Sequence, residues 1–142
     1  MKYLFILISF LSFIQFSLAA EKAYTLQSGD ASLSVVKDGK RLSLQTGNAH
    51  YLSLNAPYVV TLEVNAETLN GYYSSVKEEK GSLVCIAKLK SSHGTVFHVK
   101  DVFAPDTENH FRMDREVTIE KIGKGDDYFN SYFGLTLQRK TQ

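Results

Sequence analysis

Two charged residues, Asp101 and Arg115, occupy positions that the alternation of apolar residues assigns to the buried face of a β-strand. Asp101 is in phase with the apolar residues of 94–103, and Arg115 is in phase with those of 109–119. Side chains two residues apart point to the same side of a strand, so both charges are expected to face the core. The short connection 104–108 suits an antiparallel hairpin. Because a buried carboxylate is costly without a partner, the sequence predicts a structural ion pair between Asp101 and Arg115.

Tyrosine is the second residue type that could serve a function, because its ring can bind sugars by stacking. The chain has eight tyrosines and nine phenylalanines but no tryptophan. A flat ring on a sheet face can stack on the C–H face of a sugar, and we interpret Tyr72, Tyr128 and Tyr132 as candidate ligand-binding residues. Tyr72 and Tyr73 must point to opposite sides of a strand, so only one of them belongs to the core. The absence of tryptophan argues against a dedicated carbohydrate-binding module.

No catalytic residue, metal site or cofactor is predicted. His93 and His98 are spaced like metal ligands, but a closed zinc site needs three or four convergent ligands, so a solvent-facing His98 is favoured. The acidic segments 106–109 and 126–127 are typical of turns, and calcium binding is the alternative interpretation. The chain has no nucleophile elbow, phosphate-binding glycine loop or dinucleotide fingerprint.

The single cysteine, Cys85, lies within an apolar stretch that alternates like a strand. A lone cysteine in an exported protein cannot form an internal disulfide. No base or electropositive group lies beside Cys85 in the sequence, so a nucleophilic role is disfavoured. We therefore expect Cys85 to be a small buried apolar side chain.

Residues 1–20 have the pattern of a secretory signal peptide. Lys2 precedes a long apolar run, and the small residues Ser17 and Ala19 suit cleavage after Ala19 or Ala20. The predicted location is therefore secreted or periplasmic. The alternative is an uncleaved anchor, in which case the leader would be the only contact with a membrane. Without Lys2 the chain has fifteen basic and fifteen acidic residues, and this balance argues against nucleic acid as a partner.

The remaining residues, 21–142, are predicted to form a single all-β domain. An Asp-Gly pair at 38–39 predicts a hairpin with a type I′ turn, and only one helical turn, at 66–69, is conceivable. About nine strands at a spacing of roughly ten residues indicate an antiparallel β-sandwich or a partial supersandwich. The expected strands are 31–36, 41–45, 50–54, 58–64, 71–77, 82–89, 94–103, 109–119 and 128–137.

Three runs of the sequence resemble a known domain. They are an Asp-bearing strand at 94–103, a Phe-x-x-x-Arg-x-Val strand at 111–119 and a Phe-x-Ser strand at 127–131. Over about 58–137 the chain resembles the amino-terminal, galactose-mutarotase-like β-supersandwich of large secreted bacterial polysaccharide-degrading enzymes. The resemblance implies a glycoside hydrolase or polysaccharide lyase as the parent enzyme, with the catalytic acids mostly in a following helical domain. It therefore implies a truncated chain, whose partner would be that missing helical domain.

The leading functional hypothesis is an exported, non-catalytic or truncated module of a carbohydrate-active enzyme that contacts polysaccharide. The alternative is a free-standing exported β-sandwich that binds a ligand or a protein. A complete small hydrolase is the third hypothesis, but it requires clustered carboxylates or a catalytic triad, and the sequence shows neither.

Overall fold

The protein is built from antiparallel strands in every segment that the computed structural model describes. These segments are residues 23–46, 52–55, 58–134 and 136–139, so the leader predicted for 1–20 lies outside them. The described segments contain twelve strands in three sheets, and the predicted all-β antiparallel class is confirmed. Within these segments there is no helix with the length and hydropathy needed to cross a membrane.

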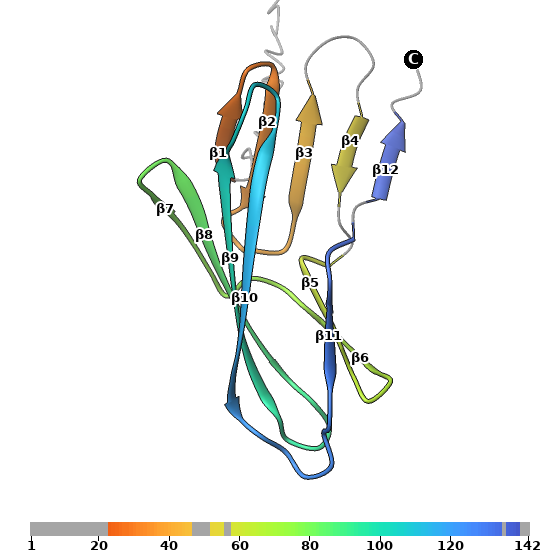
Figure 1. Ribbon diagram of the computed structural model, residues 1–142. Helices are drawn as coiled ribbons and strands as arrows, with labels where there is room; N and C mark the ends of the chain where they lie inside the picture. Colours follow the sequence, from red (N-terminus) through yellow and green to blue (C-terminus); the bar gives the residue numbers. More distant parts are fainter. Residues whose placement is uncertain (1–22, 47–51, 56–57, 135, 140–142) are drawn as a thin grey trace, which may run out of the picture.

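The first sheet has five strands and occupies the upper part of Figure 1. Its strands follow one another in the order β1-β2-β3-β4-β12, so the end of the described chain returns to pair beside β4. The strands are β1 (Ala23–Ser28), β2 (Ala31–Val36), β3 (Leu42–Thr46), β4 (Leu52–Asn55) and β12 (Thr136–Arg139).

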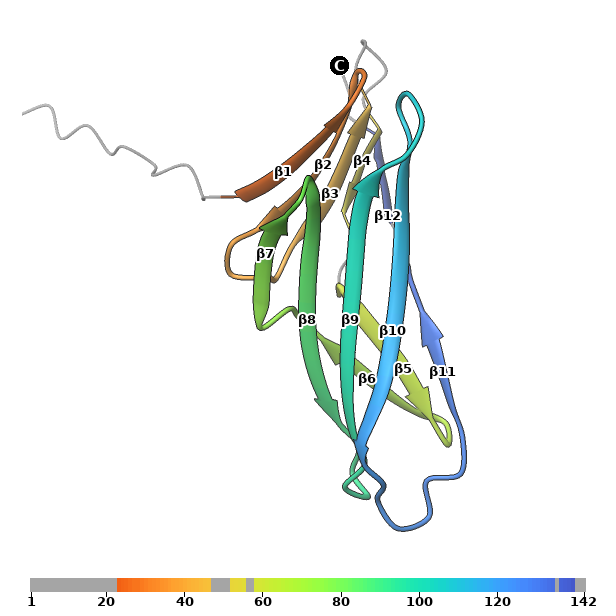
Figure 2. The ribbon, with the colours of Figure 1, turned by 60° about the vertical axis from the view of Figure 1, so that its left-hand side comes forward.

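The other two sheets have four and three strands, in the orders β10-β9-β8-β7 and β11-β5-β6. Figure 2 shows the four-stranded sheet in front, with the first sheet behind its upper part and the three-stranded sheet behind its lower part. The long strands of the front sheet therefore join both halves of the second layer. The strands are β5 (Val60–Val64), β6 (Glu67–Gly71), β7 (Ser75–Glu79), β8 (Ser82–Lys90), β9 (Val96–Pro105), β10 (Phe111–Lys121) and β11 (Phe129–Tyr132).

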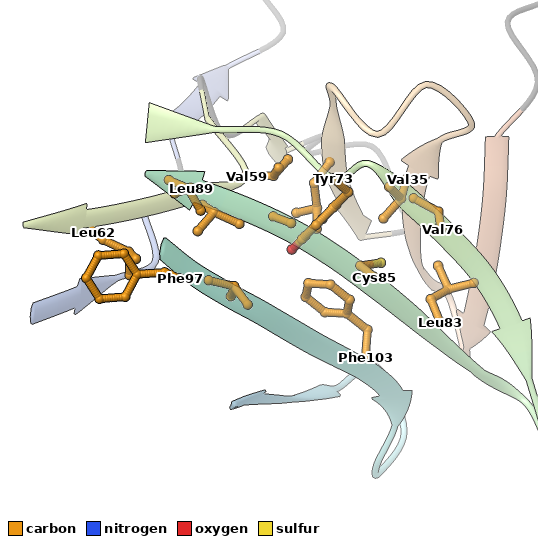
Figure 3. Close-up of a cluster of buried hydrophobic side chains, with 14 of the residues drawn as sticks. Val35, Val59, Leu62, Tyr73, Val76, Leu83, Cys85, Leu89, Phe97 and Phe103 are labelled. Atoms are coloured by element: carbon orange, nitrogen blue, oxygen red, sulfur yellow. The ribbon is translucent and has the colours of Figure 1, made fainter. Parts of the chain in front are cut away.

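The core forms between these layers because alternate side chains of each strand are apolar. Along β8 and β9 buried and less buried residues alternate strictly for most of the length, as expected for a sheet with one solvated face. Phe97 and Phe103 are among the largest fully buried side chains, and each contributes about 1.5–3 kcal/mol by leaving water. Figure 3 shows this cluster, in which side chains from all three sheets meet.

The hairpin predicted around the charged pair is present. Strands β9 and β10 are antiparallel, and Asp101 lies directly opposite Arg115 in their register. The register shifts once, between Ile119 and Lys121, near the end of β10. Strand β10 is also an edge strand, and an inward-pointing charge such as Arg115 is one device that keeps edge strands from pairing with other chains.

The turn predicted for 38–39 differs from the observed one. A hairpin does join β2 and β3, but only Gly39 has a positive φ, of 71°, whereas a type I′ turn requires two such residues. Within this longer loop Asp38 accepts a hydrogen bond from the Lys40 backbone, and the Gly39 carbonyl accepts one from the Tyr73 backbone at 3.0 Å. A Cβ atom on Gly39 would lie 1.9 Å from the Tyr73 carbonyl oxygen, so only glycine permits this contact.

The described residues contain twelve strands where the sequence predicts about nine, because the prediction omits β1 and β6 and joins β11 and β12 into one strand. Strand β6 lies where the sequence predicts at most one helical turn, at 66–69. The sharp turn lies earlier, at Asn65 and Ala66, whose φ angles of 46° and 69° match a two-residue type I′ hairpin. The strand expected at 71–77 begins only at Ser75, since the chain leaves one sheet and enters another between β6 and β7.

Candidate functional site

The three-stranded sheet has one buried face and one exposed face, and the exposed face carries tyrosine. Strand β5 buries Val60, Leu62 and Val64 and turns the residues between them outward. Tyr132 of β11 lies opposite Thr61 of β5 in the backbone register, on the outward side. Because neighbouring strands are about 4.8 Å apart, this face is about 10 Å wide from β11 to β6.

Tyr72 follows β6 and lies on the same outward side, at the opposite edge of the face. Its ring and that of Tyr58 are 5.8 Å apart, within the range of favourable aromatic contacts. Both side chains are exposed, whereas Tyr73 is almost completely buried. The prediction that Tyr72 and Tyr73 point to opposite sides is therefore confirmed.

The other edge of the face is formed by Tyr128, Asn130 and Tyr132, which are two residues apart along one strand direction. The Tyr132 hydroxyl donates a hydrogen bond of 2.7 Å to the Glu63 carboxylate. This bond is the largest cause of a raised pKa at Tyr132, and the nearby Tyr128 adds to the shift. The structure thus places Tyr132 on β11, with Tyr128 directly before this strand and Tyr72 directly after β6.

We call this surface the tyrosine face. Beside the rings it offers uncharged hydrogen-bonding groups, including the Thr61 hydroxyl, which donates to the Asn70 amide oxygen at 3.0 Å. Glu63 is its one charged residue. Tyr58, Glu63 and Asn70 were not among the predicted site residues, although the alternation of 60–64 indicates which side chains point outward. The face consists of Tyr58, Thr61, Glu63, Asn70, Tyr72, Tyr128, Asn130 and Tyr132.

The predicted ion pair between Asp101 and Arg115 lies behind the tyrosine face, in the interior. Asp101 is 0% exposed, and Arg115 contacts both of its oxygens at 2.6 Å, through Nε and one terminal nitrogen. The Tyr73 hydroxyl donates a third hydrogen bond to Asp101, of 2.5 Å. A buried carboxylate with this many charge-assisted bonds is satisfied rather than poised to react.

Arg115 also connects the front sheet to the strands that carry the tyrosine face. Its terminal nitrogens donate to the Tyr132 carbonyl at 2.8 Å, the Ser131 hydroxyl at 3.2 Å and the Val59 carbonyl at 3.1 Å. With the two bonds to Asp101, all five N–H groups of the guanidinium are used. The Phe133 ring lies 5.8 Å from the guanidinium carbon. Arg115 thereby fixes the backbone of β11 at Tyr132.

Two further side chains beside Asp101 cannot readily ionise. Burial, followed by the charge of Asp101, raises the pKa of Tyr73 far above its usual value. The same two causes raise the pKa of the Cys85 thiol to about 12. Cys85 is fully buried and free, as predicted, and the thiol rather than the nucleophilic thiolate is present at neutral pH.

A second nearly buried carboxylate, Asp126, lies at the far end of the front sheet. It accepts hydrogen bonds from the Ser91 hydroxyl at 2.6 Å and from the Thr95 hydroxyl. His93 donates its Nδ1–H at 3.0 Å, because a carboxylate can only accept. These bonds, led by the one from Ser91, lower the pKa of Asp126 to about 2. We call Asp126 with Ser91, His93 and Thr95 the Asp126 latch.

The latch holds the segment after β10 against the turn between β8 and β9. Gly123 donates its backbone N–H to the Thr95 hydroxyl at 2.7 Å. A Cβ atom on Gly123 would lie 2.4 Å from the His93 carbonyl oxygen and 2.5 Å from the Thr95 nitrogen, so the close approach requires glycine. The carboxylate of Asp126, interpreted from the sequence as a turn former or a calcium ligand, is here saturated by side-chain donors.

The two carboxylates lie in separate hydrogen-bond networks in the part of the chain that the structure describes. Asp101 and Asp126 accept from different groups, and no three His, Cys, Asp or Glu side chains there gather where they could hold a metal ion. Comparison of the chain with family models, with curated proteins and with solved structures found no match. The tyrosine face is therefore the candidate functional site on the evidence of its own geometry.

Proposed function

We propose that this chain is an exported β-sandwich module that binds polysaccharide through the tyrosine face. The observation that carries the proposal is the grouping of exposed Tyr58, Tyr72 and Tyr132 with amide and hydroxyl groups on one sheet face. Aromatic rings stack on the apolar faces of sugars, while amides and hydroxyls can bond the sugar hydroxyls. The leader pattern of 1–20 supports export to a location where polysaccharides occur.

Binding without hydrolysis is the function that this arrangement favours. Glycoside hydrolysis uses two carboxyl groups that flank the scissile bond, and Glu63 is the one carboxylate of the tyrosine face. Its charge repels polyanionic chains, so neutral polysaccharides are the preferred ligands. A shallow face buries little of a ligand, and the affinity is expected to be weak.

Calorimetric titration with a panel of neutral and acidic polysaccharides tests the proposal. Removing either ring, by Tyr72→Ala or Tyr132→Ala, should weaken binding about two- to twelvefold, because an aromatic contact contributes about 0.5–1.5 kcal/mol. Tyr132→Phe keeps the ring and should bind like the parent chain. Ile122→Ala removes an exposed apolar side chain outside the face and is the matched control.

Two results would overturn the proposal. One is binding that survives loss of both rings, in the double variant Tyr72→Ala with Tyr132→Ala. The other is release of reducing sugar that a single carboxylate substitution, such as Glu63→Gln or Asp127→Asn, abolishes. The first result would move the binding site elsewhere, and the second would make the protein a hydrolase.

A further inference from the structure

A small apolar cleft lies at the end of the molecule next to the Asp126 latch, beneath the segment that joins β10 to β11. Its volume is about 150 Å³, a size at which an apolar cavity admits one six-membered ring. Thr95, Asp126 and Asp127 contribute its polar lining. Its apolar lining consists of Val64, Phe97, Ile119, Ile122, Tyr128 and Phe129.

Hydrogen bonds from Asn65 and from the Asp126 latch fix the segment that covers the cleft. Asn65 donates to the Gly125 carbonyl at 2.5 Å, and its amide oxygen accepts from the backbone of Asp127 and Tyr128 at 3.2 and 3.3 Å. The Asp126 latch fixes the other side of the same segment. A ligand would therefore find a preformed site and would lose little affinity to the ordering of side chains or loops.

The rim of the cleft exposes large apolar side chains to water. Ile122 is 73% exposed and Tyr128 is 57% exposed, while Phe97 at the floor is fully buried. Exposed apolar groups gathered around a hollow are typical of binding sites rather than of ordinary surface. The opening thus provides both a ring-sized space and an apolar entrance.

The charges around the cleft indicate which ligands it prefers. The lining contains two carboxylates and neither lysine nor arginine. Lys121 and Lys124 lie nearby in the sequence but do not line the cleft. Asp126 is saturated by the latch, whereas the exposed Asp127 carboxylate has no hydrogen-bond or ion-pair partner among the described residues. A carboxylate beside aromatic rings attracts organic cations and repels anions.

We propose that this cleft binds small organic cations in which a ring-sized apolar group carries an ammonium group. The ring enters between Phe97, Phe129 and the rim, and the ammonium pairs with Asp127. The cleft shares Tyr128 with the edge of the tyrosine face, but this proposal does not depend on polysaccharide binding.

Titration of the purified full chain with three ligands of one shape, followed by amide NMR, tests the proposal. The ligands are benzylamine, benzyl alcohol and benzoate at matched ionic strength. We expect shifts confined to the residues that line the cleft, near 64, 95–97, 119–122 and 126–129. Benzylamine should bind about two- to fivefold more tightly than benzyl alcohol, as an exposed ion pair allows. Benzoate should bind most weakly.

Matched variants separate the apolar from the charged part of the site. Asp127→Asn should keep binding of benzyl alcohol and remove the advantage of benzylamine, while Asp106→Asn, an exposed carboxylate in another loop, should change nothing. Ile122→Ser should weaken all three ligands. Tyr72→Ala should leave amine binding intact, which separates this site from the tyrosine face. The absence of local shifts, equal binding of benzoate, or an Asp127→Asn variant that still prefers benzylamine would overturn the proposal.

Discussion

Asp101 and Asp126 are both carboxylates that the fold removes from water, yet they are neutralised in different ways. Asp101 is 0% exposed and is paired with a cation, Arg115, as well as with the Tyr73 hydroxyl. The Asp126 side chain is 5% exposed and accepts from two neutral hydroxyls and from His93. The deeper carboxylate therefore has the full positive charge beside it.

The difference follows from what surrounds each group. At the centre of the sandwich no water can reach the carboxylate, and only an opposite charge with several hydrogen bonds offsets the cost of burial. At the end of the front sheet some contact with solvent remains, so hydrogen bonds from hydroxyls suffice to keep the carboxylate ionised. The first group joins two sheets through Arg115, whereas the second fastens a loop.

The largest expected effect is the loss of the buried pair. Asp101→Ala leaves Arg115 buried without its counter-charge and should lower the free energy of unfolding by about 3–5 kcal/mol in urea titrations. The double change Asp101→Leu with Arg115→Met should cost much less, because both charges leave together. Arg112→Ala, which breaks an exposed pair with Asp114 on the same strand, is the control and should cost little. Additive losses in the double-mutant cycle would contradict the pairing.

A smaller effect is expected from the third member of the buried network. Tyr73→Phe removes the hydroxyl that donates to Asp101 and should lower the free energy of unfolding by about 1.5–3 kcal/mol, the usual value for a hydrogen bond to a charged group. Tyr24→Phe provides a matched change at a partly buried tyrosine of β1 and should be close to neutral. Equal effects of the two substitutions would mean that Asp101 gains nothing from Tyr73.

The smallest effect concerns the Asp126 latch and depends on pH. A carboxylate whose pKa falls from 3.8 to about 2 on folding stabilises the native state above its unfolded pKa, and this contribution is lost as the pH falls through about 2. The difference in urea midpoint between the parent chain and Asp126→Asn should therefore shrink between pH 4 and pH 2. A difference that stays constant over this range would show that ionised Asp126 does not stabilise the fold.

The same contrast explains what could be predicted about each carboxylate. The partner of Asp101 was deduced because an antiparallel hairpin places a residue of one strand directly opposite a residue of the next. The partners of Asp126 precede it by more than thirty residues and lie at a turn between two other strands. Nothing in the local sequence distinguishes Asp126 from an ordinary turn-forming aspartate.

The candidate site also combines features that the local sequence predicts with features that depend on contacts between distant segments. Alternation along the strands indicated that Tyr72 faces away from Tyr73, but the pairing of β6 with β5 and of β5 with β11 depends on which strands become neighbours. That choice brought Tyr58 and Glu63 beside the predicted tyrosines. The prediction of binding to polysaccharide stays a prediction.

By itself the sequence determined the all-β class, the central hairpin with its buried ion pair, and the interior position of Cys85, because side-chain alternation and hairpin register are local properties of the chain. The tertiary structure alone decided the division into three sheets, the acceptors that receive the five hydrogen bonds of Arg115, the Asp126 latch and the cleft beside it. Each of these depends on contacts between segments that are distant along the chain, and such contacts form only when the layers pack together.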